Sequence, residues 1–371
     1  MENLVNPAVW QGKSVFLTGH TGFKGGWLAL WLAEMGAQVT GFSLAAPTDP
    51  SLFEAADIAG LVQHIEGDIR EREALIAAMR IARPDVVFHL AAQPIVRLSY
   101  MEPVETYATN VMGTVHLLDA VRQIGGPCAV VCVTSDKCYE NREWVWPYRE
   151  NDPVGGHDPY SSSKGCAELV VAAYRRSYFE PARLREHGIG VASVRAGNVI
   201  GGGDWAHDRL VPDLIRSRST GTAPEIRSPD AVRPWQHVLD ALAGYLLVAE
   251  RLLAGDASAA DAWNFGPADE DTRPVRSIVR RLGALWGWRD NWTAPATQQP
   301  HEAKVLRLDC SKARTRLAWR PRITLEATLQ SIVEWHDAYD NGCDVREVSL
   351  AQLRRYGFLP PAETNVRKAS A

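Results

Sequence analysis

Short apolar runs alternate with stretches in which apolar side chains recur at helical spacing, from about residue 15 to about residue 265. The first apolar run, Val15–Leu17, ends in a turn that contains three glycines. Beyond the turn, one helical face would carry these apolar side chains: Trp27, Leu28, Trp31, Leu32 and Met35. Such spacing is typical of a helix packed on a core. The chain therefore opens with a predicted strand, a glycine turn and a helix.

The glycine turn has the spacing of a dinucleotide-binding loop. Gly19 permits a tight turn, Gly22 lets the backbone approach a pyrophosphate, and Gly25 lets the helix pack on the strand. Unpaired N–H groups at the start of the helix would bind the anion. The alternative is a glycine-rich turn without a ligand, which the flanking strand and helix disfavour. We expect these residues to bind the dinucleotide: Gly19, His20, Thr21, Gly22, Phe23, Lys24 and Gly25.

Five further strands are predicted at 37–42, 64–70, 83–93, 129–137 and 189–194, with helices over 105–123 and 239–253 between or after them. The run at 129–133 is continuously apolar, which is typical of a parallel strand buried on both faces. Strands that alternate with helices predict an α/β fold. We expect a doubly wound parallel Rossmann sheet with a smaller, interleaved C-terminal α+β substrate domain.

The alternation ends near residue 268, and tryptophans become frequent beyond it. We therefore predict a dinucleotide-binding domain formed by residues 12–198 and 233–264. Residues 199–232 and 265–360 would form the substrate domain, and residues 361–371 a frayed tail.

Composition narrows the class of protein. A chain of 371 residues can hold two structural units. Its net charge of −4 argues against a nucleic-acid or acidic-membrane partner. We see no signal-peptide pattern and no apolar run near the ~18 residues of a membrane helix, so we expect a cytoplasmic protein. The six cysteines are scattered without metal-type spacing and are interpreted as core thiols, with no metal site.

Chemically active side chains gather where the strand over 129–137 ends: Thr134, Ser135, Asp136 and Lys137. Ligands of open α/β sheets bind outside the carboxyl ends of strands. Downstream, Tyr160 and Lys164 lie four residues apart and share a face of a predicted helix. The lysine ammonium would lower the pKa of the tyrosine and hold the nicotinamide ribose, so that the tyrosine can take a proton from a sugar hydroxyl. Combined with the glycine turn, this pattern predicts hydride transfer.

Other cofactor contacts are expected at the remaining strand ends. Asp68 and Ile69 would border the adenine, and Asn110 would bond backbone near the site. The small residues that end the fourth strand would lie against the cofactor: Leu90, Ala91 and Ala92. The second strand ends at Ser43 without an acidic residue, so the sequence does not choose between NAD and NADP.

Five segments carry a family resemblance, namely 18–25, 134–139, 195–205, 233–238 and 306–313. Through them the chain resembles the extended short-chain dehydrogenase/reductase family over nearly its whole length. Within that family it is similar to the sugar-nucleotide 4,6-dehydratases, and more narrowly to the branch that acts on CDP-D-glucose.

The resemblance implies a closed NAD redox cycle on CDP-D-glucose, for deoxysugar and lipopolysaccharide O-antigen biosynthesis. Tyr160 helps oxidise the C4 hydroxyl, and the hydride passes to NAD. Asp136 protonates the departing C6 hydroxyl, for which its pKa must be raised by burial. The hydride then returns to C6 and gives a 4-keto-6-deoxy sugar. The implied catalytic residues are Ser135, Asp136, Lys137, Tyr160 and Lys164.

Substrate contacts rest partly on side-chain chemistry. Arg209 and Arg233 are candidate diphosphate clamps, because arginine binds phosphate oxygens bidentately, and surface ion pairs are the alternative. The remaining candidates are Gln93, Asn198, Leu210 and Glu302. The cytidine base is implied by the resemblance alone.

One position departs from the related dehydratases that act on deoxythymidine-linked sugars, which have a glutamate after the aspartate as the base at C5. Lys137 stands there. A lysine base must be neutral, which needs a pKa about three units below its usual ~10.4. Alternatively, Lys137 stays charged and stabilises the enolate while Tyr160 collects the C5 proton.

Other functions stay open at this stage. The same scaffold supports sugar-nucleotide epimerases and reductases, and a cofactor-sensing binding protein without turnover is a third possibility. The resemblance also implies a homodimer through a four-helix interface made by 105–123 and 160–178, and potentially a dimer of dimers.

Overall fold

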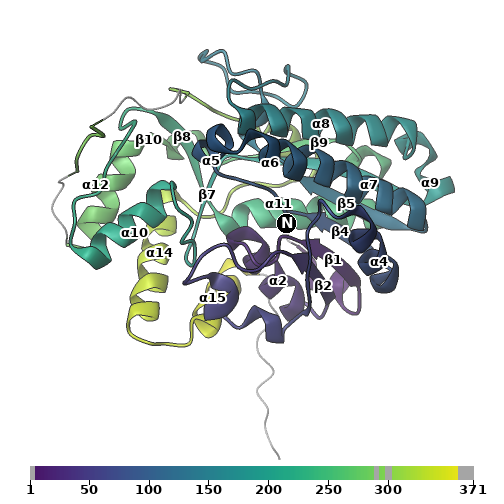
Figure 1. Cartoon of the computed structure of the whole chain (residues 1–371), viewed down its shortest axis with the longest axis horizontal. Helices are drawn as coiled ribbons and strands as arrows, with labels where there is room; N and C mark the ends of the chain where they lie inside the picture. Colours follow the sequence, from purple (N-terminus) through teal and green to yellow (C-terminus); the bar gives the residue numbers. More distant parts are fainter. Residues whose placement is uncertain (1–4, 288–291, 297–302, 358–371) are drawn as a thin grey trace, which may run out of the picture.

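The structure is a computed structural model that describes residues 5–287, 292–296 and 303–357. A seven-stranded sheet forms its centre (Figure 1). In spatial order the strands are β3 (Gln63–Glu66), β2 (Gln38–Ser43), β1 (Ser14–Thr18), β4 (Val86–His89), β5 (Cys128–Val133), β6 (Ile189–Ala196) and β9 (Ala262–Phe265). Each neighbouring pair is parallel. Because the strand order reverses between β1 and β4, the predicted doubly wound topology is confirmed.

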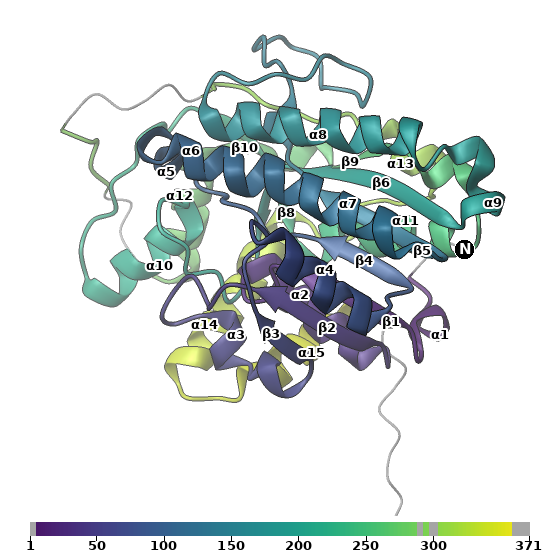
Figure 2. The same cartoon turned by 45° about the vertical axis from the view of Figure 1, so that its right-hand side comes forward.

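Helices cover both faces of this sheet (Figure 2). On one face lie α4 (Arg72–Ala82), α7 (Gly113–Ile124) and α8 (Pro159–Ser177), and on the other α2 (Phe23–Glu34) and α11 (Val238–Leu253). Successive strand residues point to opposite faces. Phe16 therefore packs in the core under α4, α7 and α8, while Val15 and Leu17 pack in the core under α2 and α11. The sheet is therefore buried on both faces, as its apolar strands predict.

The helix predicted over 105–123 is interrupted. It consists of α6 (Pro103–Tyr107), the π-helical segment η2 (Ala108–Met112) and α7. Asn110 lies within η2, and its amide bonds both backbone groups of Gln93, at 2.9 and 3.0 Å, and Ser163 Oγ at 2.9 Å. The predicted bond from Asn110 to nearby backbone is thus confirmed, and the π segment is the local distortion that aims it.

A second sheet contains β10 (Thr272–Pro274), β8 (Val232–His237) and β7 (Asn198–Ile200). Its core brings together side chains of α10 (Leu210–Thr220), α12 (Val275–Leu285) and α14 (Leu325–Asp340) with Trp235. The predicted boundary at residue 233 falls inside β8, because that strand pairs with β7 and β10 before the chain returns to the large sheet through α11.

The remaining helices are short or peripheral: α1 (Pro7–Trp10), α3 (Leu52–Ala55), α5 (Val96–Met101), α9 (Leu184–His187), α13 (Ser311–Arg316), α15 (Val345–Tyr356), η1 (Ile58–Gly60), η3 (Asp136–Cys138), η4 (Pro181–Arg183), η5 (Ala257–Ala259) and η6 (Asp269–Asp271). Among the described residues, no helix combines the length and apolar character that spanning a bilayer requires. The predicted tail, 361–371, lies outside the described residues.

Candidate active site

The glycine loop packs as its spacing predicts. Gly19 has φ +79°, and a Cβ there would lie 2.6 Å from the backbone nitrogen of Ala91. A Cβ on Gly25 would overlap the carbonyl oxygen of Gly19, so this glycine lets α2 approach β1. At Gly22 the nearest atom would be 3.5 Å away, and no side chain caps the first N–H groups of α2. The open space at Gly22, which has no side chain, and an uncapped helix start fit a pyrophosphate.

A cavity of about 800 Å³ opens at the carboxyl ends of β4, β5 and β6, between the two sheets. The predicted site residues that line it come from both parts of the chain: Phe23, Lys24, Leu90, Ala92, Thr134, Ser135, Asp136, Lys137, Tyr160, Lys164, Asn198, Arg209, Leu210 and Arg233. The structure therefore brings all the predicted catalytic residues into one cavity. The predicted substrate residues Asn198, Arg209, Leu210 and Arg233 line the same cavity.

Helix α8 carries Tyr160 and Lys164 into this cavity. The helix begins at Pro159, and the Asp158 carboxylate caps it by accepting the Ser161 N–H at 2.9 Å. The backbone N–H of Tyr160 donates to Ser99 Oγ at 3.1 Å. These contacts fix the first turn of α8 and therefore the direction of the Tyr160 ring.

Ser135 connects the two candidate acid–base groups. Its hydroxyl donates to Asp136 Oδ1 at 3.1 Å and accepts the Lys137 N–H at 3.2 Å. It also lies close enough to Tyr160 to lower the pKa of the phenol. Asp136 is buried, and its Oδ2 has no hydrogen-bond partner among the described residues. Burial raises the pKa of Asp136, which the mechanism implied by the resemblance requires. A protonated carboxyl next to a cavity can donate its proton to a leaving hydroxyl.

The pKa of Tyr160 differs from the prediction. Burial raises it to about 12, and the hydrogen bond from Ser135 lowers it only in part. Lys164 is not among the main causes of this shift, so the expected lowering by its ammonium is not confirmed. Burial lowers the pKa of Lys164 itself to about 8, and the Glu168 carboxylate opposes that shift. The charge of Glu168, four residues along the same helix, thus acts on the lysine ammonium.

Two further lysines face Asp136. Lys137 is half-buried, and its charge lowers the Asp136 pKa against the larger effect of burial. Burial, together with Arg209 and Lys164, lowers the pKa of Lys24 to about 7. The first turn of α2 therefore places the Lys24 side chain at the cavity.

The candidate diphosphate clamps are held by other groups. Arg209 precedes α10 and donates to Asp204 Oδ2 at 3.0 Å. Arg233 is buried on β8 and donates to the carbonyl of Val232 at 3.0 Å. Asp204 was not predicted as a site residue, although it lies in the segment 195–205 that carries the family resemblance.

The ion pair between Arg97 and Asp208, 3.1 Å apart, was not predicted either. Both side chains line the cavity, one from α5 and the other from the loop before α10. No sequence spacing indicates that contact, because 111 residues separate the two side chains.

Several predicted contacts lie outside the cavity lining. Gln93 uses its side-chain amide on Thr106 and on the Ile95 N–H. Strand β3 ends at Glu66, so the predicted strand over 64–70 is too long and Asp68 follows it, paired with Arg70. The other predicted residues that do not line the cavity are Gly19, His20, Thr21, Gly22, Gly25, Ile69, Ala91 and Asn110. Glu302 lies outside the described residues. His89 is a satisfied core histidine, bonded to Thr18 and Thr114.

Comparison with known proteins agrees with this geometry. The family model described as GDP-mannose 4,6 dehydratase matches residues 16–332. A protein of Salmonella typhimurium named CDP-glucose 4,6-dehydratase is 56% identical over 351 residues, which cover 93% of this chain and 98% of that protein. A dTDP-glucose 4,6-dehydratase of Xanthomonas campestris is 25% identical, over 86% of this chain and 92% of its own length.

Solved structures show the same fold. The dTDP-glucose 4,6-dehydratase DesIV of Streptomyces venezuelae, solved with NAD and TYD bound, superposes with a TM-score of 0.75 at 23% identity, over 90% of this chain and 99% of that chain. UDP-glucose 4-epimerase of Thermotoga maritima gives a TM-score of 0.74 at 22% identity, over 88% and 99%. Because the family model spans most of the chain and the Salmonella relative is more than half identical, this protein belongs to the nucleotide-sugar dehydratase family described as GDP-mannose 4,6 dehydratase, within the short-chain dehydrogenase/reductases.

Proposed function

We propose that this protein is an NAD-dependent lyase that converts CDP-D-glucose to CDP-4-keto-6-deoxy-D-glucose and water. One observation carries the reaction type: the buried Asp136 carboxyl, whose pKa is raised, accepts a hydrogen bond from Ser135 and lines the same cavity as Tyr160. Simple reductases and epimerases need no second acid at this place. The CDP-linked sugar rests on the 56% identical relative, which bears that substrate in its name.

The chain offers a fitting site for the cofactor. The uncapped start of α2 and the open space at Gly22 suit a pyrophosphate, and Lys164 would hold the nicotinamide ribose. When bound, NAD supplies a reversible hydride acceptor and a positive charge. We infer that the part built on the seven-stranded sheet binds this cofactor and that the part built on the second sheet binds the nucleotide sugar, with Arg209 and Arg233 on its diphosphate.

Each acid–base step falls to a residue of this chain. Tyr160 takes the proton of the C4 hydroxyl, and Ser135 stabilises the phenolate when its hydroxyl turns from Asp136 to donate to Tyr160. Asp136 gives its proton to the C6 hydroxyl as water leaves. Both residues are buried, so their proton transfers are shielded from bulk water. Ser135 holds the Asp136 carboxyl through its hydrogen bond to Oδ1.

The proton acceptor at C5 has two candidates. Lys137 accepts the proton if it is neutral. Alternatively, Lys137 stays charged and stabilises the enolate while Tyr160 accepts the C5 proton, after it has released the C4 proton to water in the cavity. A Lys137→Met variant separates the two, because it removes the base in the first case and only a stabilising charge in the second. Exchange of the C5 hydrogen with deuterated water, measured by mass spectrometry, would stop in the first case and persist at a reduced rate in the second.

Isotope transfer tests the reaction itself. The purified protein is incubated with NAD and CDP-glucose deuterated at C4, and the product is analysed by NMR. The dehydratase moves the label to C6, whereas an epimerase leaves it at C4. A binding protein without turnover returns unchanged substrate, and a Tyr160→Phe variant would then behave as wild type. Parallel reactions with glucose linked to other nucleotides test the preference for cytidine.

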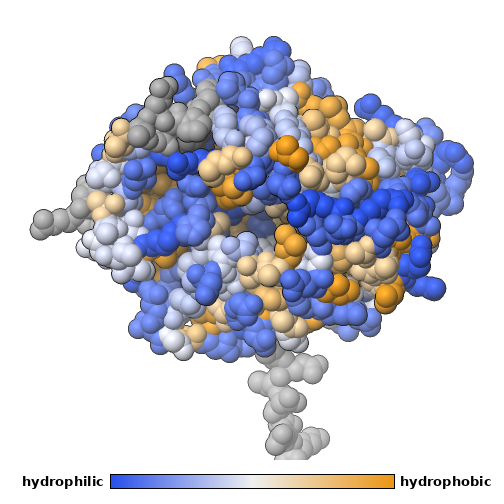
Figure 3. Space-filling model, in the orientation of Figure 1, coloured by the Kyte–Doolittle hydropathy of each residue, from blue (hydrophilic) through white to orange (hydrophobic). Residues whose placement is uncertain are grey.

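A homodimer fits the surface of the same helices. Apolar side chains gather over α7 and α8 (Figure 3), and Val104, Met112 and Leu169 are exposed there or on the adjoining segments. We propose that these helices pair with those of a second copy in the cytoplasm. Light scattering would detect the dimer, and Leu169→Glu should convert it to a monomer if that face is the interface.

A further inference from the structure

Glu168 is a buried carboxylate on α8 that lies outside the lining of the active-site cavity. It follows Lys164 by four residues, so the two side chains project from one face of the helix. Carboxylates are rarely buried unless other groups satisfy them. The contacts of Glu168 therefore indicate what it does.

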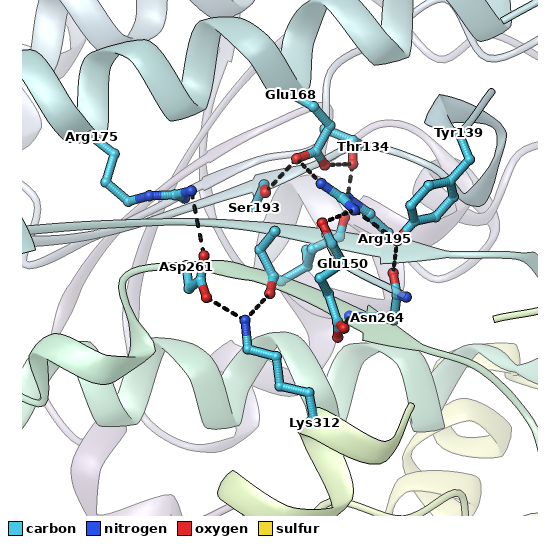
Figure 4. Close-up of polar contacts among 12 residues, drawn as sticks. Thr134, Tyr139, Glu150, Glu168, Arg175, Ser193, Arg195, Asp261, Asn264 and Lys312 are labelled. Atoms are coloured by element: carbon cyan, nitrogen blue, oxygen red, sulfur yellow. Dashed lines mark hydrogen bonds and ion pairs between the residues drawn. The ribbon is translucent and has the colours of Figure 1, made fainter. Parts of the chain in front are cut away.

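Three groups from the central sheet bind this carboxylate (Figure 4). Arg195 on β6 donates to Oε2 at 2.7 Å, and Ser193 on the same strand donates to Oε2 at 2.7 Å. Thr134, at the end of β5, donates to Oε1. Arg195 and the hydrogen bonds keep the pKa of Glu168 below its usual value despite its burial. Glu168 is thus a fixed negative charge inside the protein.

The same contacts join α8 to the strand end that carries the catalytic serine. Thr134 directly precedes Ser135, and it is bonded to Glu168 on the helix of Tyr160 and Lys164. Arg195 also donates to the Tyr139 hydroxyl at 2.7 Å, and Tyr139 donates to Asn264 on β9 at 2.7 Å. The carboxylate therefore links α8 to β5, β6 and β9 through side chains alone (Figure 4).

The buried ammonium of Lys164 needs a negative charge nearby. It is buried, and no ion pair within 4 Å is formed by Lys164 in the part of the chain that the structure describes. Its surroundings are Cys132 on β5, Cys138 in η3, His89 on β4 and the like-charged Lys24 on α2. None of these groups is an anion in its usual protonation state. Glu168 is the main group that opposes loss of the proton from Lys164.

We propose that Glu168 is a positioning residue of the active site, which holds Lys164 as an ammonium ion and fixes α8 against the strand that bears Ser135. This role is distinct from catalysis, because Glu168 does not reach the cavity. Arg195 prevents the carboxylate from taking the lysine proton, because it balances the negative charge and occupies Oε2. The proposal deepens the proposed function, on which its catalytic consequence rests.

The test measures the protonation of Lys164 directly. Protein labelled with ¹³C at the lysine ε-carbon is titrated by NMR, and the Lys164 signal is assigned by its loss in Lys164→Arg. In the wild type Lys164 should stay protonated at pH 7 and titrate near pH 8 or above. In Glu168→Gln the titration should fall by about one pH unit or more, because an opposite charge is removed. Ser193→Ala, which removes one hydrogen bond and no charge, should leave the titration near that of the wild type.

Turnover supplies the second readout. The alkaline limb of the pH profile of kcat should move to lower pH in Glu168→Gln by the same amount as the Lys164 titration, with near wild-type turnover at the acid end. A purely structural role would lower turnover equally at every pH and leave the titration in place, which overturns the proposal. Should the variant not fold, a wild-type Lys164 that titrates below pH 7 also overturns it. A shifted titration in a protein without dehydratase activity contradicts the proposed function and leaves the inference about Lys164 standing.

Discussion

Asp136→Asn isolates the elimination step. Asparagine keeps the shape of the side chain and an acceptor for the Ser135 hydroxyl, but it has no acidic proton. On one side the carboxyl is closely packed, because a Cβ on Gly197 would lie 2.9 Å from Asp136 Oδ2 and closer still to Pro234. The variant therefore removes proton donation to the C6 hydroxyl and little else.

The size of the effect follows from the role. A positioned general acid contributes about 10²- to 10⁴-fold to a rate, which corresponds to about 3–5 kcal/mol of activation free energy. Folding should not suffer. The pKa of Asp136 is raised in the folded state, so the charged carboxylate destabilises the fold as pH rises through that value. At pH 8 the neutral asparagine variant should be at least as stable as the wild type.

Rapid mixing with NAD and CDP-glucose checks the prediction. Oxidation at C4 precedes elimination, so the absorbance of reduced nicotinamide should build up in the variant while product forms slowly. Asp213→Asn is the matched control, because that carboxyl also lines the cavity and has a raised pKa from burial, but it pairs with Arg216. It should turn over near the wild-type rate. Wild-type turnover in Asp136→Asn, or loss of C4 oxidation in a folded variant, would refute the assignment.

Three further predictions concern the loop, the diphosphate and stability. Gly25→Ala should lower the melting temperature, since its Cβ meets the Gly19 carbonyl, whereas Gly22→Ala should fold normally and weaken NAD binding measured by calorimetry. Arg209→Gln should raise KM for the nucleotide sugar by about 10- to 100-fold, the size of a hydrogen bond to a charged group, and an unchanged KM would exclude Arg209 as a clamp. Burial raises the pKa of Glu250 from 4.5 to about 7, so stability should fall as pH rises from 4.5 to 7, by up to about 3 kcal/mol. Glu250→Gln can still accept from Trp10 Nε1, and chemical denaturation should show that it loses this pH dependence.

Local patterns sufficed for much of the fold. Apolar runs and helical spacing predict β1, α2, β5 and α8 because each pattern depends on which face of one element is buried. The glycine loop was predictable for the same reason, since the tight approach of Gly19 to Ala91 and of Gly25 to Gly19 is a property of a single strand–turn–helix unit. The residues from Thr134 to Lys137 line the cavity, as expected for parallel strands that present their carboxyl ends at one edge.

The sequence alone determined the fold class, the dinucleotide loop and the residue types of the site. Tertiary structure decided which of those residues share a cavity and how they are charged. It assigned β8 to the second sheet, paired Asp68 with Arg70, and bound Glu168, on the helix of Lys164, to Arg195, 27 residues away along the chain. It also raised the pKa of both Asp136 and Tyr160. Burial and pairing depend on every segment packed around a group, whereas a sequence pattern records only the segment that carries it.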